Sequence, residues 1–296
     1  MKIQYMSDLH MELWDNSQYI KAAIKREESE LASIPECEQA RPKVKANEFE
    51  AKGDVLVLAG DTFYLRDIIT PQKRFWNWVS KSFRQVLLVP GNHEFYSNSD
   101  VTSRGDSWQW IFRENVGYYY NKVVRIDDTD FILTTLWSRI PEVDMFHVHR
   151  GMNDFRQIMY DGHRFTSDDF NLEHEKCLQF LKQAVEDSTA KHIVVVTHHL
   201  PTLAVVAPQH KGSALNGAFA TELGNFIADS RIDVWIYGHS HTNIDTMIGN
   251  TRIVSNQLGY IYYNEHLRTD LMQIKLLRYE QNRRHCLLRF SGLAVI

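Results

Sequence analysis

Short apolar runs alternate with longer amphipathic segments along most of this chain. Five runs have almost no polar position inside them, at residues 2–7, 54–59, 85–89, 192–197 and 233–237. Runs of this length are typical of inner β-strands that are covered on both faces. Three segments with helical spacing or helix-start signals lie between the runs, at residues 71–83, 167–187 and 216–228. This alternation of strands and helices predicts an α/β sandwich.

Other segments predict antiparallel hairpins. Residues 118–126 and 130–137 flank a turn at 127–129, and residues 244–248 and 251–255 flank Gly249-Asn250, a good two-residue hairpin turn. A third hairpin is predicted over residues 271–296, turning near 280–282.

One stretch interrupts the pattern, at residues 21–52. It carries seven basic and seven acidic side chains and few large apolar ones. We predict a surface helix followed by an irregular stretch, inserted between the first two strands as a solvated excursion. A role in covering the substrate is the alternative. The chain shows no repeat and no linker, so residues 1–296 are predicted to form a single domain.

The composition speaks against a nucleic-acid-binding, membrane-bound or disulfide-rich protein. The hydrophobic fraction of 44% and the charged fraction of 24% are ordinary for a globular protein. A formal charge of −4 gives no overall attraction to nucleic acid or to an anionic membrane. Cys37, Cys177 and Cys286 lie too far apart for a zinc site or a disulfide framework. With no signal peptide and no membrane-spanning run recognisable, we predict a cytoplasmic protein.

Residues that can bind metal ions recur directly after the β-rich runs. The blocks are Asp8-Leu9-His10, Gly60-Asp61, Gly91-Asn92-His93-Glu94, Thr197-His198-His199 and Gly238-His239-Ser240-His241. They offer oxygen and imidazole nitrogen but no thiolate, a mixture that suits Mn, Fe, Zn or Co. Residues two apart in a strand point the same way, so the members of an Asp-x-His or His-x-His pair can converge on one ion. The pattern indicates a centre with two metal ions.

The charges of such a centre point to its substrate. Two divalent ions outweigh the carboxylates of Asp8 and Asp61, and Asn92 adds an oxygen without adding charge. Asp61 is the natural candidate to bridge the two ions, because a carboxylate has two oxygens. A positive centre favours an anionic substrate, and paired ions stabilise the attacking and leaving oxygens of an in-line displacement. Phosphoryl transfer fits this arrangement best.

The five blocks in this order resemble the calcineurin-like metallophosphoesterase superfamily. Further stretches at 134–137, 153–156, 216–220 and 251–260 are similar to a bacterial branch of predicted phosphoesterases. The resemblance implies an α/β fold, a four-layer αββα sandwich with two central mixed β-sheets flanked by helices. It also implies a dinuclear centre, with manganese as the favoured metal.

The resemblance also implies a role for each residue. Asp8, His10 and His241 would bind the first ion, Asp61 would bridge, and Asn92, His198 and His239 would complete the second. A metal-bound hydroxide would attack the phosphorus. His93 would stay free of metal and protonate the leaving oxygen. His199 and Glu94 are predicted to support the site without binding an ion.

Arginines that the sequence lacks bear on the class of substrate. The protein serine/threonine phosphatase branch carries Asp-Arg-Gly after its second block and an arginine before its third, whereas this chain has residues 62–67 as Thr-Phe-Tyr-Leu-Arg-Asp and Val89-Pro90. We therefore expect a small phosphomonoester or a phosphodiester as substrate rather than a phosphoprotein, and the sequence leaves open which of the two esters it is. Four arginines in one polar region are candidates to clamp the phosphate, although solvated charges are the simpler interpretation: Arg139, Arg150, Arg156 and Arg164.

Two other functions remain open. A nuclease of the same superfamily would need a basic groove or a stacking platform, and the acidic balance counts against a nucleic-acid partner. A non-catalytic scaffold would tend to lose ligands or the free histidine, whereas this chain keeps both. The segment from Arg268 onward is locally basic and could form a homodimer contact.

Overall fold

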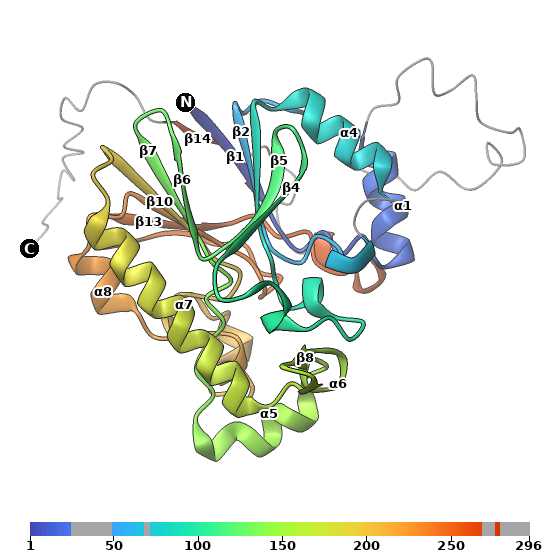
Figure 1. Ribbon diagram of the computed structural model, residues 1–296, viewed down its shortest axis with the longest axis vertical. Coiled ribbons are helices and arrows are strands. Elements are labelled where there is room, and N and C mark those ends of the chain that lie inside the picture. Colours follow the sequence, from blue (N-terminus) through green and yellow to red (C-terminus); the bar gives the residue numbers. More distant parts are fainter. Residues whose placement is uncertain (25–48, 68–71, 268–275, 279–296) are drawn as a thin grey trace, which may run out of the picture.

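Two six-stranded β-sheets lie face to face at the centre of the molecule, with helices on their outer faces (Figure 1). The computed structural model describes residues 1–24, 49–67, 72–267 and 276–278. Each sheet contains both parallel and antiparallel strand pairs. The predicted four-layer αββα sandwich with two mixed sheets is therefore confirmed.

The first sheet has the strand order β14-β1-β2-β3-β5-β4. Its strands are β1 (Lys2–Met6), β2 (Val55–Ala59), β3 (Gln85–Val89), β4 (Trp108–Arg113), β5 (Val116–Tyr120) and β14 (Leu276–Arg278). The four inner strands are parallel, and the edge strands β14 and β4 pair antiparallel with their neighbours. The carboxyl ends of β1, β2 and β3 consequently meet at one end of the sandwich.

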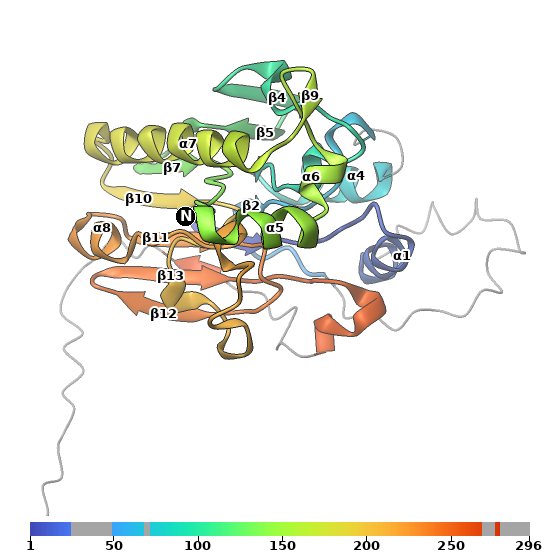
Figure 2. The same cartoon turned by 90° about the horizontal axis from the view of Figure 1, so that it is seen from below.

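The second sheet has the order β12-β13-β11-β10-β7-β6. Its strands are β6 (Lys122–Ile126), β7 (Thr129–Leu133), β10 (His192–Val196), β11 (Val234–Tyr237), β12 (Asp245–Ile248) and β13 (Thr251–Ser255). In Figure 2 the strands β7, β10, β11, β13 and β12 of this sheet follow one below the other. Here too the inner strands are parallel and the edges antiparallel.

Helices form the two outer layers. The helices α1 (Trp14–Ala23) and α4 (Lys73–Ser82) flank the first sheet, and α7 (Ser167–Asp187) and α8 (Gly224–Asp229) flank the second (Figure 1). The helices α5 (Met145–Gly151) and α6 (Asp154–Gln157) lie below the sheets with the small hairpin of β8 (Met159–Tyr160) and β9 (His163–Arg164).

Short 3-10 helices occupy many of the connections. They are η1 (Leu65–Asp67), η2 (His93–Phe95), η3 (Val101–Arg104), η4 (Glu142–Asp144), η5 (Leu203–Val205), η6 (Pro208–His210), η7 (Asn216–Ala218), η8 (Ile261–Tyr263) and η9 (Glu265–Leu267).

The core divides into three apolar layers because strand side chains alternate between faces. In β2, Val55 and Val57 belong to the layer between the two sheets, whereas Leu56 and Leu58 belong to the layer beneath α4. All of β2 is buried, which explains its continuous apolar sequence. A third layer lies between the second sheet and α7 and α8. Burial on both faces holds the inner strands, and therefore the loops at their ends, in fixed positions.

The five predicted inner strands and the helix at 167–187 are confirmed. A capping box between Thr166 and Asp169 starts that helix, where Thr166 Oγ1 accepts from the Asp169 amide and Asp169 Oδ2 accepts from the Thr166 amide. The hairpin at 244–255 is also confirmed, with Gly249 at a φ of 57° in its turn.

The prediction of one strand over residues 118–126 is wrong. The segment contains two strands, β5 in the first sheet and β6 in the second. Asn121 separates them with a φ of 51°, and its side chain donates to the carbonyl of Asp106 and accepts from Thr134 Oγ1. Asparagine tolerates this left-handed conformation, so the chain can turn from one sheet into the other there. The following hairpin of β6 and β7 forms as predicted.

The prediction of a helix over residues 216–228 is wrong in its first half. The helix α8 begins only at Gly224. Before it, Ala220 pairs with Leu200 in an isolated β-bridge, and the amide of Thr221 donates to the Leu200 carbonyl. This pairing with a distant segment outweighs the local preference for a helix.

Three predictions fall wholly or partly outside the described residues. The helix predicted over 71–83 is observed from Lys73 to Ser82, and position 71 is not described. Most of the 21–52 stretch and of the C-terminal hairpin is likewise not described, although residues 21–23 end α1 and residues 276–278 form β14 against β1.

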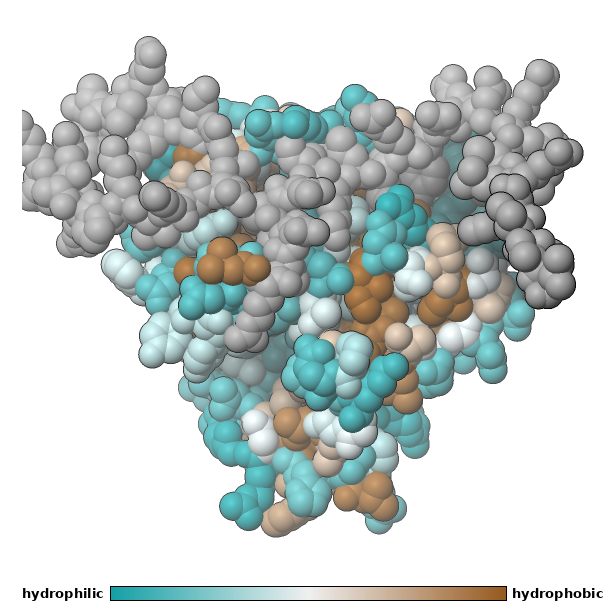
Figure 3. All heavy atoms as spheres, turned by 180° about the vertical axis from the view of Figure 1, so that it is seen from behind, coloured by the Kyte–Doolittle hydropathy of each residue, from teal (hydrophilic) through white to brown (hydrophobic). Residues whose placement is uncertain are grey.

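The surface mixes polar and apolar side chains. On the face opposite to that of Figure 1, hydrophobic side chains stand in groups between hydrophilic ones (Figure 3). Exposed apolar side chains are normal for a globular protein, because polar groups are too few to cover its whole surface. Within the described part of the chain, every helix is too short or too polar to cross a bilayer.

We predict that the layer between the sheets contributes much of the stability. Val57 is fully buried there, whereas 43% of Val123 on β6 is exposed. Val57→Ala should lower the free energy of unfolding by about 1–3 kcal/mol, because two buried methyl-sized groups leave a cavity. Val123→Ala removes the same atoms from the surface and should change it by less than ~0.5 kcal/mol. Urea unfolding of both variants tests this, and equal effects would contradict it.

Candidate metal centre

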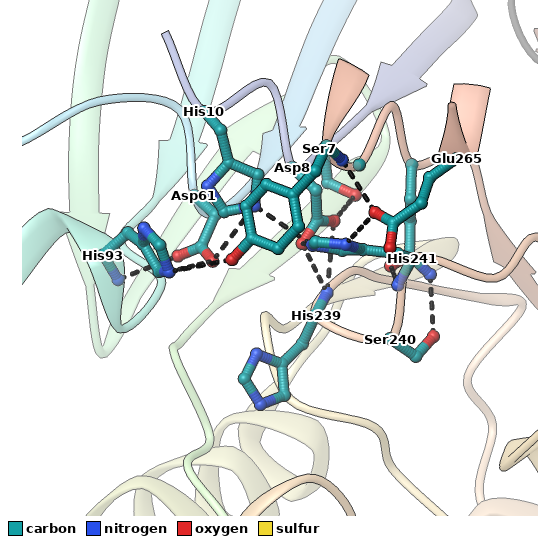
Figure 4. A network of polar contacts seen from close by, with 12 residues as sticks. Ser7, Asp8, His10, Asp61, His93, His239, Ser240, His241 and Glu265 are labelled. Carbon is teal, nitrogen blue, oxygen red and sulfur yellow. Dashed lines mark hydrogen bonds and ion pairs between the residues drawn. The ribbon is translucent and has the colours of Figure 1, made fainter. Parts of the chain in front are cut away.

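All the residues predicted to bind metal meet at the carboxyl ends of strands from both sheets. Asp8 and His10 follow β1, Asp61 follows β2, and Asn92 follows β3 in the first sheet. His198 follows β10, and His239 and His241 follow β11 in the second sheet. Figure 4 shows side chains from both sheets pointing toward one another. The site therefore lies across the junction of the two sheets, and neither sheet contains it alone.

Five of these residues have left-handed backbone conformations. The φ angles are 54° at Asp8, 44° at His10, 52° at Asp61, 75° at His239 and 48° at His241. Such angles are uncommon for residues with a Cβ and cost about 1–3 kcal/mol each. They turn the chain sharply where each strand ends. Left-handed angles at so many donors indicate that the positions of the side chains, rather than local stability, determine these turns.

The first donor group contains Asp8, His10 and His241. His10 Nε2 lies 3.0 Å from His241 Nε2, and His241 Nε2 lies 3.5 Å from Asp8 Oδ1. The Asp8 carboxylate is held in place because it accepts hydrogen bonds from Ser7 Oγ and from the amide of His239. These three residues can bind one cation together.

The second donor group contains Asn92, His198 and His239. His198 Nε2 lies 3.1 Å from both Asn92 Oδ1 and His239 Nδ1. The Asn92 amide group donates to Asp154 Oδ1 and to the Tyr96 hydroxyl, which leaves its oxygen facing His198. The group can bind a second cation.

Asp61 faces both groups. Its Oδ2 lies 3.8 Å from His10 Nε2, and its Oδ1 lies 3.3 Å from His198 Nε2. The backbone around Asp61 leaves room for this arrangement. A Cβ at Gly60 would stand 2.2 Å from His198 Nδ1, and a Cβ at Gly91 would stand 2.1 Å from Asp61 Oδ1, so glycine is needed at both positions. The carboxylate has the placement that a bridging ligand needs.

The outer ring nitrogens of three histidines are occupied. His10 Nδ1 lies 3.1 Å from Glu12 Oε1, His241 Nδ1 lies 2.6 Å from Glu265 Oε2, and His198 Nδ1 lies 3.0 Å from the carbonyl oxygen of Ala59. Each acceptor requires a proton on Nδ1, which directs the lone pair of Nε2 toward the centre. This second hydrogen bond is typical of histidines that bind metal ions.

The inner ring nitrogens fit a divalent ion. Two imidazole nitrogens that face each other with lone pairs repel unless a cation stands near both. Two ligands at right angles around one ion, each ~2.1 Å from it, are about 3 Å apart, and the observed separations of 3.0 and 3.1 Å match. On His239 the inner nitrogen is Nδ1, and the other ring nitrogen, Nε2, is buried without a hydrogen-bond partner among the described residues. Oxygen and imidazole donors without thiolate suit Mn, Fe, Zn or Co.

The buried carboxylates give the centre a negative potential. Burial by itself lowers the pKa of His198, but the charge of Asp61 raises it to about 9. Burial likewise lowers the pKa of His241, but hydrogen bonds to Asp8 and Glu265 raise it to about 10. Desolvation raises the pKa of Asp61 itself, yet the nearby imidazoles hold it well below the ordinary value. The positions of these two imidazoles therefore favour a positive charge, whether of a proton or of a metal cation.

His93 lies at the edge of the centre, outside the two donor groups defined above, although it is close to His10 and Asp61. Its ring stacks on Tyr96 with a centroid separation of 4.2 Å and meets His10 edge-on at 4.4 Å. Its Nδ1 lies 2.8 Å from Glu12 Oε1, and its Nε2 lies 3.5 Å from the Tyr260 hydroxyl. His93 also lines a cavity of about 390 Å³ that opens onto the centre.

Glu94 and His199 lie beside the donor groups. The Glu94 carboxylate accepts from the amides of Asp61, Thr62 and Gly91, so it ties the loop after β2 to the loop after β3. His199 is fully buried, and its ring lies 5.3 Å from the Trp137 ring and 4.3 Å from that of His239.

The cavity has a mixed lining. Apolar side chains form part of its wall, among them Met152, Leu200, Val206, Leu215 and Phe219. Among the described residues that line it, none is lysine or arginine.

The four candidate arginines contact other groups. Arg139 pairs with Glu175 at 3.0 Å, Arg164 donates to Asn98, Arg156 donates to Asn153, and Arg150 lies over the Phe146 ring. None of the four is among the described residues that line the cavity.

The sequence patterns did not identify three carboxylates that lie at the site, namely Glu12, Asp154 and Glu265. Asp154 is fully buried and holds Asn92 and Tyr96, and Glu265 also accepts from the amide of Tyr260. The spacing Asp-x-His-x-Glu at 8–12 continues the alternation of the first block and could have indicated Glu12. Glu265 follows the last block by 24 positions, and nothing in the local pattern distinguishes it.

Comparison with known proteins identifies a family whose sequence model matches most of this chain. The sequence model of the calcineurin-like phosphoesterases matches residues 1–243. An uncharacterized protein of Acanthamoeba polyphaga mimivirus is 27% identical over 223 residues, which are 68% of this chain and 79% of that protein.

A solved structure shares the fold over nearly the whole length of both chains. A phosphopantetheinyl hydrolase from Mycobacterium tuberculosis aligns with a TM-score of 0.58 and 15% identity, over 96% of this chain and 97% of that one. A dimetal phosphatase from Danio rerio aligns more weakly, with a TM-score of 0.42 and 12% identity, over 87% of each chain.

We predict that the protein binds two Mn²⁺ ions per chain and that Asp61→Asn lowers the affinity for at least one of them by more than about 100-fold. The reason is that removing a ligand should cost more than removing a hydrogen-bond partner of a ligand, which costs about 10–100-fold. Equilibrium dialysis followed by metal analysis measures this. Asp67→Asn, at an exposed acid six positions away, is the matched control and should keep both ions. Two ions bound by Asp61→Asn with unchanged affinity would contradict the bridging role.

Proposed function

The chain belongs to the calcineurin-like phosphoesterase family, and on this premise we propose that it is a hydrolase that uses two divalent metal ions to cleave a phosphate ester, with a preference for phosphodiesters. The observation that supports this most strongly is the position of Asp61 between two donor groups that each present inward-facing nitrogens and oxygens.

The two donor groups would each hold one ion. When bound, such a pair of ions lowers the pKa of water and neutralises charge that develops on the phosphate oxygens. Asp8, His10 and His241 would hold the first. Asn92, His198 and His239 would hold the second, with Asp61 shared. We favour manganese because the donor set combines carboxylate, amide oxygen and imidazole.

His93 would act on the leaving group. Hydrolysis joins the oxygen of water to phosphorus and breaks the P–O bond to the leaving alcohol, whose oxygen keeps the electron pair. That oxygen needs a proton, and we propose that His93, which lines the cavity, gives it. The proton that water loses balances the one that His93 gives.

The cavity favours a diester over a monoester. A phosphomonoester carries close to two negative charges near neutral pH, and enzymes commonly neutralise them with arginine. The described lining offers neither lysine nor arginine, whereas a diester carries one charge and needs less compensation. The apolar part of the wall can accept the second ester group.

We predict that, with Mn²⁺, the protein hydrolyses bis(nitrophenyl) phosphate with a higher kcat/KM than nitrophenyl phosphate, by about tenfold or more, equivalent to ~1.4 kcal/mol in the transition state. Initial rates of nitrophenol release measure both. A preference for the monoester would contradict the argument from the cavity. Faster cleavage of single-stranded DNA than of either ester would favour a nuclease.

We further predict that His93→Ala lowers kcat by about 10²–10⁴-fold, the usual contribution of a general acid, for a diester whose phenyl leaving group needs a proton. Both metal ions should remain bound, because His93 is not one of the proposed ligands. His147→Ala, at an exposed histidine on α5, is the matched control and should keep full activity. Loss of metal from His93→Ala would show that His93 is a ligand instead.

A further inference from the structure

One buried carboxylate joins the proposed catalytic histidine to a proposed metal ligand. Glu12 Oε1 lies 2.8 Å from His93 Nδ1 and 3.1 Å from His10 Nδ1. The side chain of Glu12 is 3% exposed, and its Oε2 has no hydrogen-bond partner among the described residues. A buried carboxylate without partners is costly, so these two hydrogen bonds are what make this position possible.

The hydrogen bond to Glu12 settles an ambiguity that packing leaves open. Stacking on Tyr96 fixes the plane of the His93 ring, with an angle of 27° between the two rings. Rotating the ring by half a turn about its bond to Cβ keeps that plane but exchanges the positions of nitrogen and carbon atoms. Since Glu12 only accepts hydrogen bonds, it selects the orientation in which Nδ1–H points to it. The other nitrogen, Nε2, then faces the cavity.

The surroundings of Nε2 suit a group that delivers a proton. Asp61 Oδ2 lies 4.0 Å away, and the Tyr260 hydroxyl lies 3.5 Å away. Both residues line the same cavity as His93. Nε2 is therefore held beside the centre without a close hydrogen bond to a charged group that would retain its proton.

We propose that Glu12 is the positioning residue of His93, and that it holds Nε2 of that ring toward the leaving oxygen of the substrate. This inference rests on the proposed function. It gives Glu12 a different role from Glu265, which holds the Nδ1 of the metal-binding His241. Glu12 also supports His10, so its removal should affect metal binding as well as proton delivery.

The dependence on the leaving group separates these two effects. Two diesters are compared with Mn²⁺ at saturation, one with a dinitrophenyl group that leaves without a proton and one with a phenyl group that needs a proton. Glu12→Ala should lower kcat for the phenyl ester by about 10²-fold, within the range for general acids, and that for the dinitrophenyl ester by less than about tenfold. Equal losses for the two esters would overturn the positioning role.

Two further variants separate the loss of metal binding from the loss of proton delivery. Glu265→Ala removes the matching carboxylate from a metal ligand, and it should weaken metal binding about 10–100-fold without any dependence on the leaving group. In a His93→Ala background, Glu12→Ala should cause little additional loss for the phenyl ester, since both changes remove one function. Fully additive losses would overturn the inference.

A readout without turnover tests the same contact. In nitrogen-15 histidine spectra recorded before metal is added, at a pH above the His93 pKa of about 9 so that the ring is neutral, the His93 Nδ1 signal, assigned with His93→Ala, should show a fixed protonated Nδ1. In Glu12→Ala that signal should show exchange between both tautomers. An unchanged signal would overturn the inference. If Glu12→Ala does not fold, Glu12→Gln replaces it. The neutral amide of this variant accepts a weaker hydrogen bond from His93, so the variant should change the activity and the spectrum in the same direction by a smaller amount.

The activity of the wild-type protein toward the two esters shows which of the two proposals has failed. If it hydrolyses neither ester with Mn²⁺, the proposed function fails, and the role of Glu12 in it fails too. If it hydrolyses both and Glu12→Ala loses activity uniformly, only the inference about Glu12 fails.

Discussion

The placement of the Asp61 carboxylate between two sets of imidazoles is the constraint on which the rest of the site depends. Its Oδ1 lies 3.3 Å from His198 of the second sheet, and its Oδ2 lies 3.8 Å from His10 of the first. The charge is buried, so it requires compensation from close cations or donors. The amide of His93 supplies one hydrogen bond to it. The two sheets must therefore keep their relative position closely for the site to persist.

The three apolar layers of the core hold the sheets in this relative position, and this rigidity offsets the strain of the turns that carry the donor residues. The left-handed conformations at five donor residues would not persist in a short peptide. They persist here because strands buried on both faces end immediately before them and fix the entry direction of each loop. Burial of inner strands such as β2 therefore supports the site directly, since a loosened strand would release the turn at its end.

Local apolar runs predicted the inner strands, and the blocks of possible metal ligands were recognisable because each follows such a run. The resemblance to a known family then implied which seven residues would bind the ions, and the fold brings these seven together. Features that depend on distant contacts were not predictable in this way. Asn121 divides an apparently continuous strand between two sheets, and the pairing of Ala220 with Leu200 replaces a helix that local preference favours. Glu265 reaches His241 from a segment with no recognisable pattern of its own. In each case the deciding partner lies far away along the chain.

The carboxylates behind the ligands change the charge of the centre, and this bears on the substrate. From the sequence, two divalent ions outweigh Asp8 and Asp61 and leave a positive centre. The structure adds Glu12 and Glu265, each within hydrogen-bond distance of an imidazole of the first donor group. Burial by itself raises the pKa of Glu12, but its hydrogen bonds with His10 and His93 lower it to about 2, so it is charged near neutral pH. When ionised, Asp8, Asp61, Glu12 and Glu265 carry four negative charges against the four positive charges of two divalent ions, and Asp154 lies behind Asn92 of the second group. A centre that is close to neutral attracts a doubly charged phosphomonoester less strongly than a positive one would, which is a second reason, independent of the cavity lining, to favour a singly charged diester.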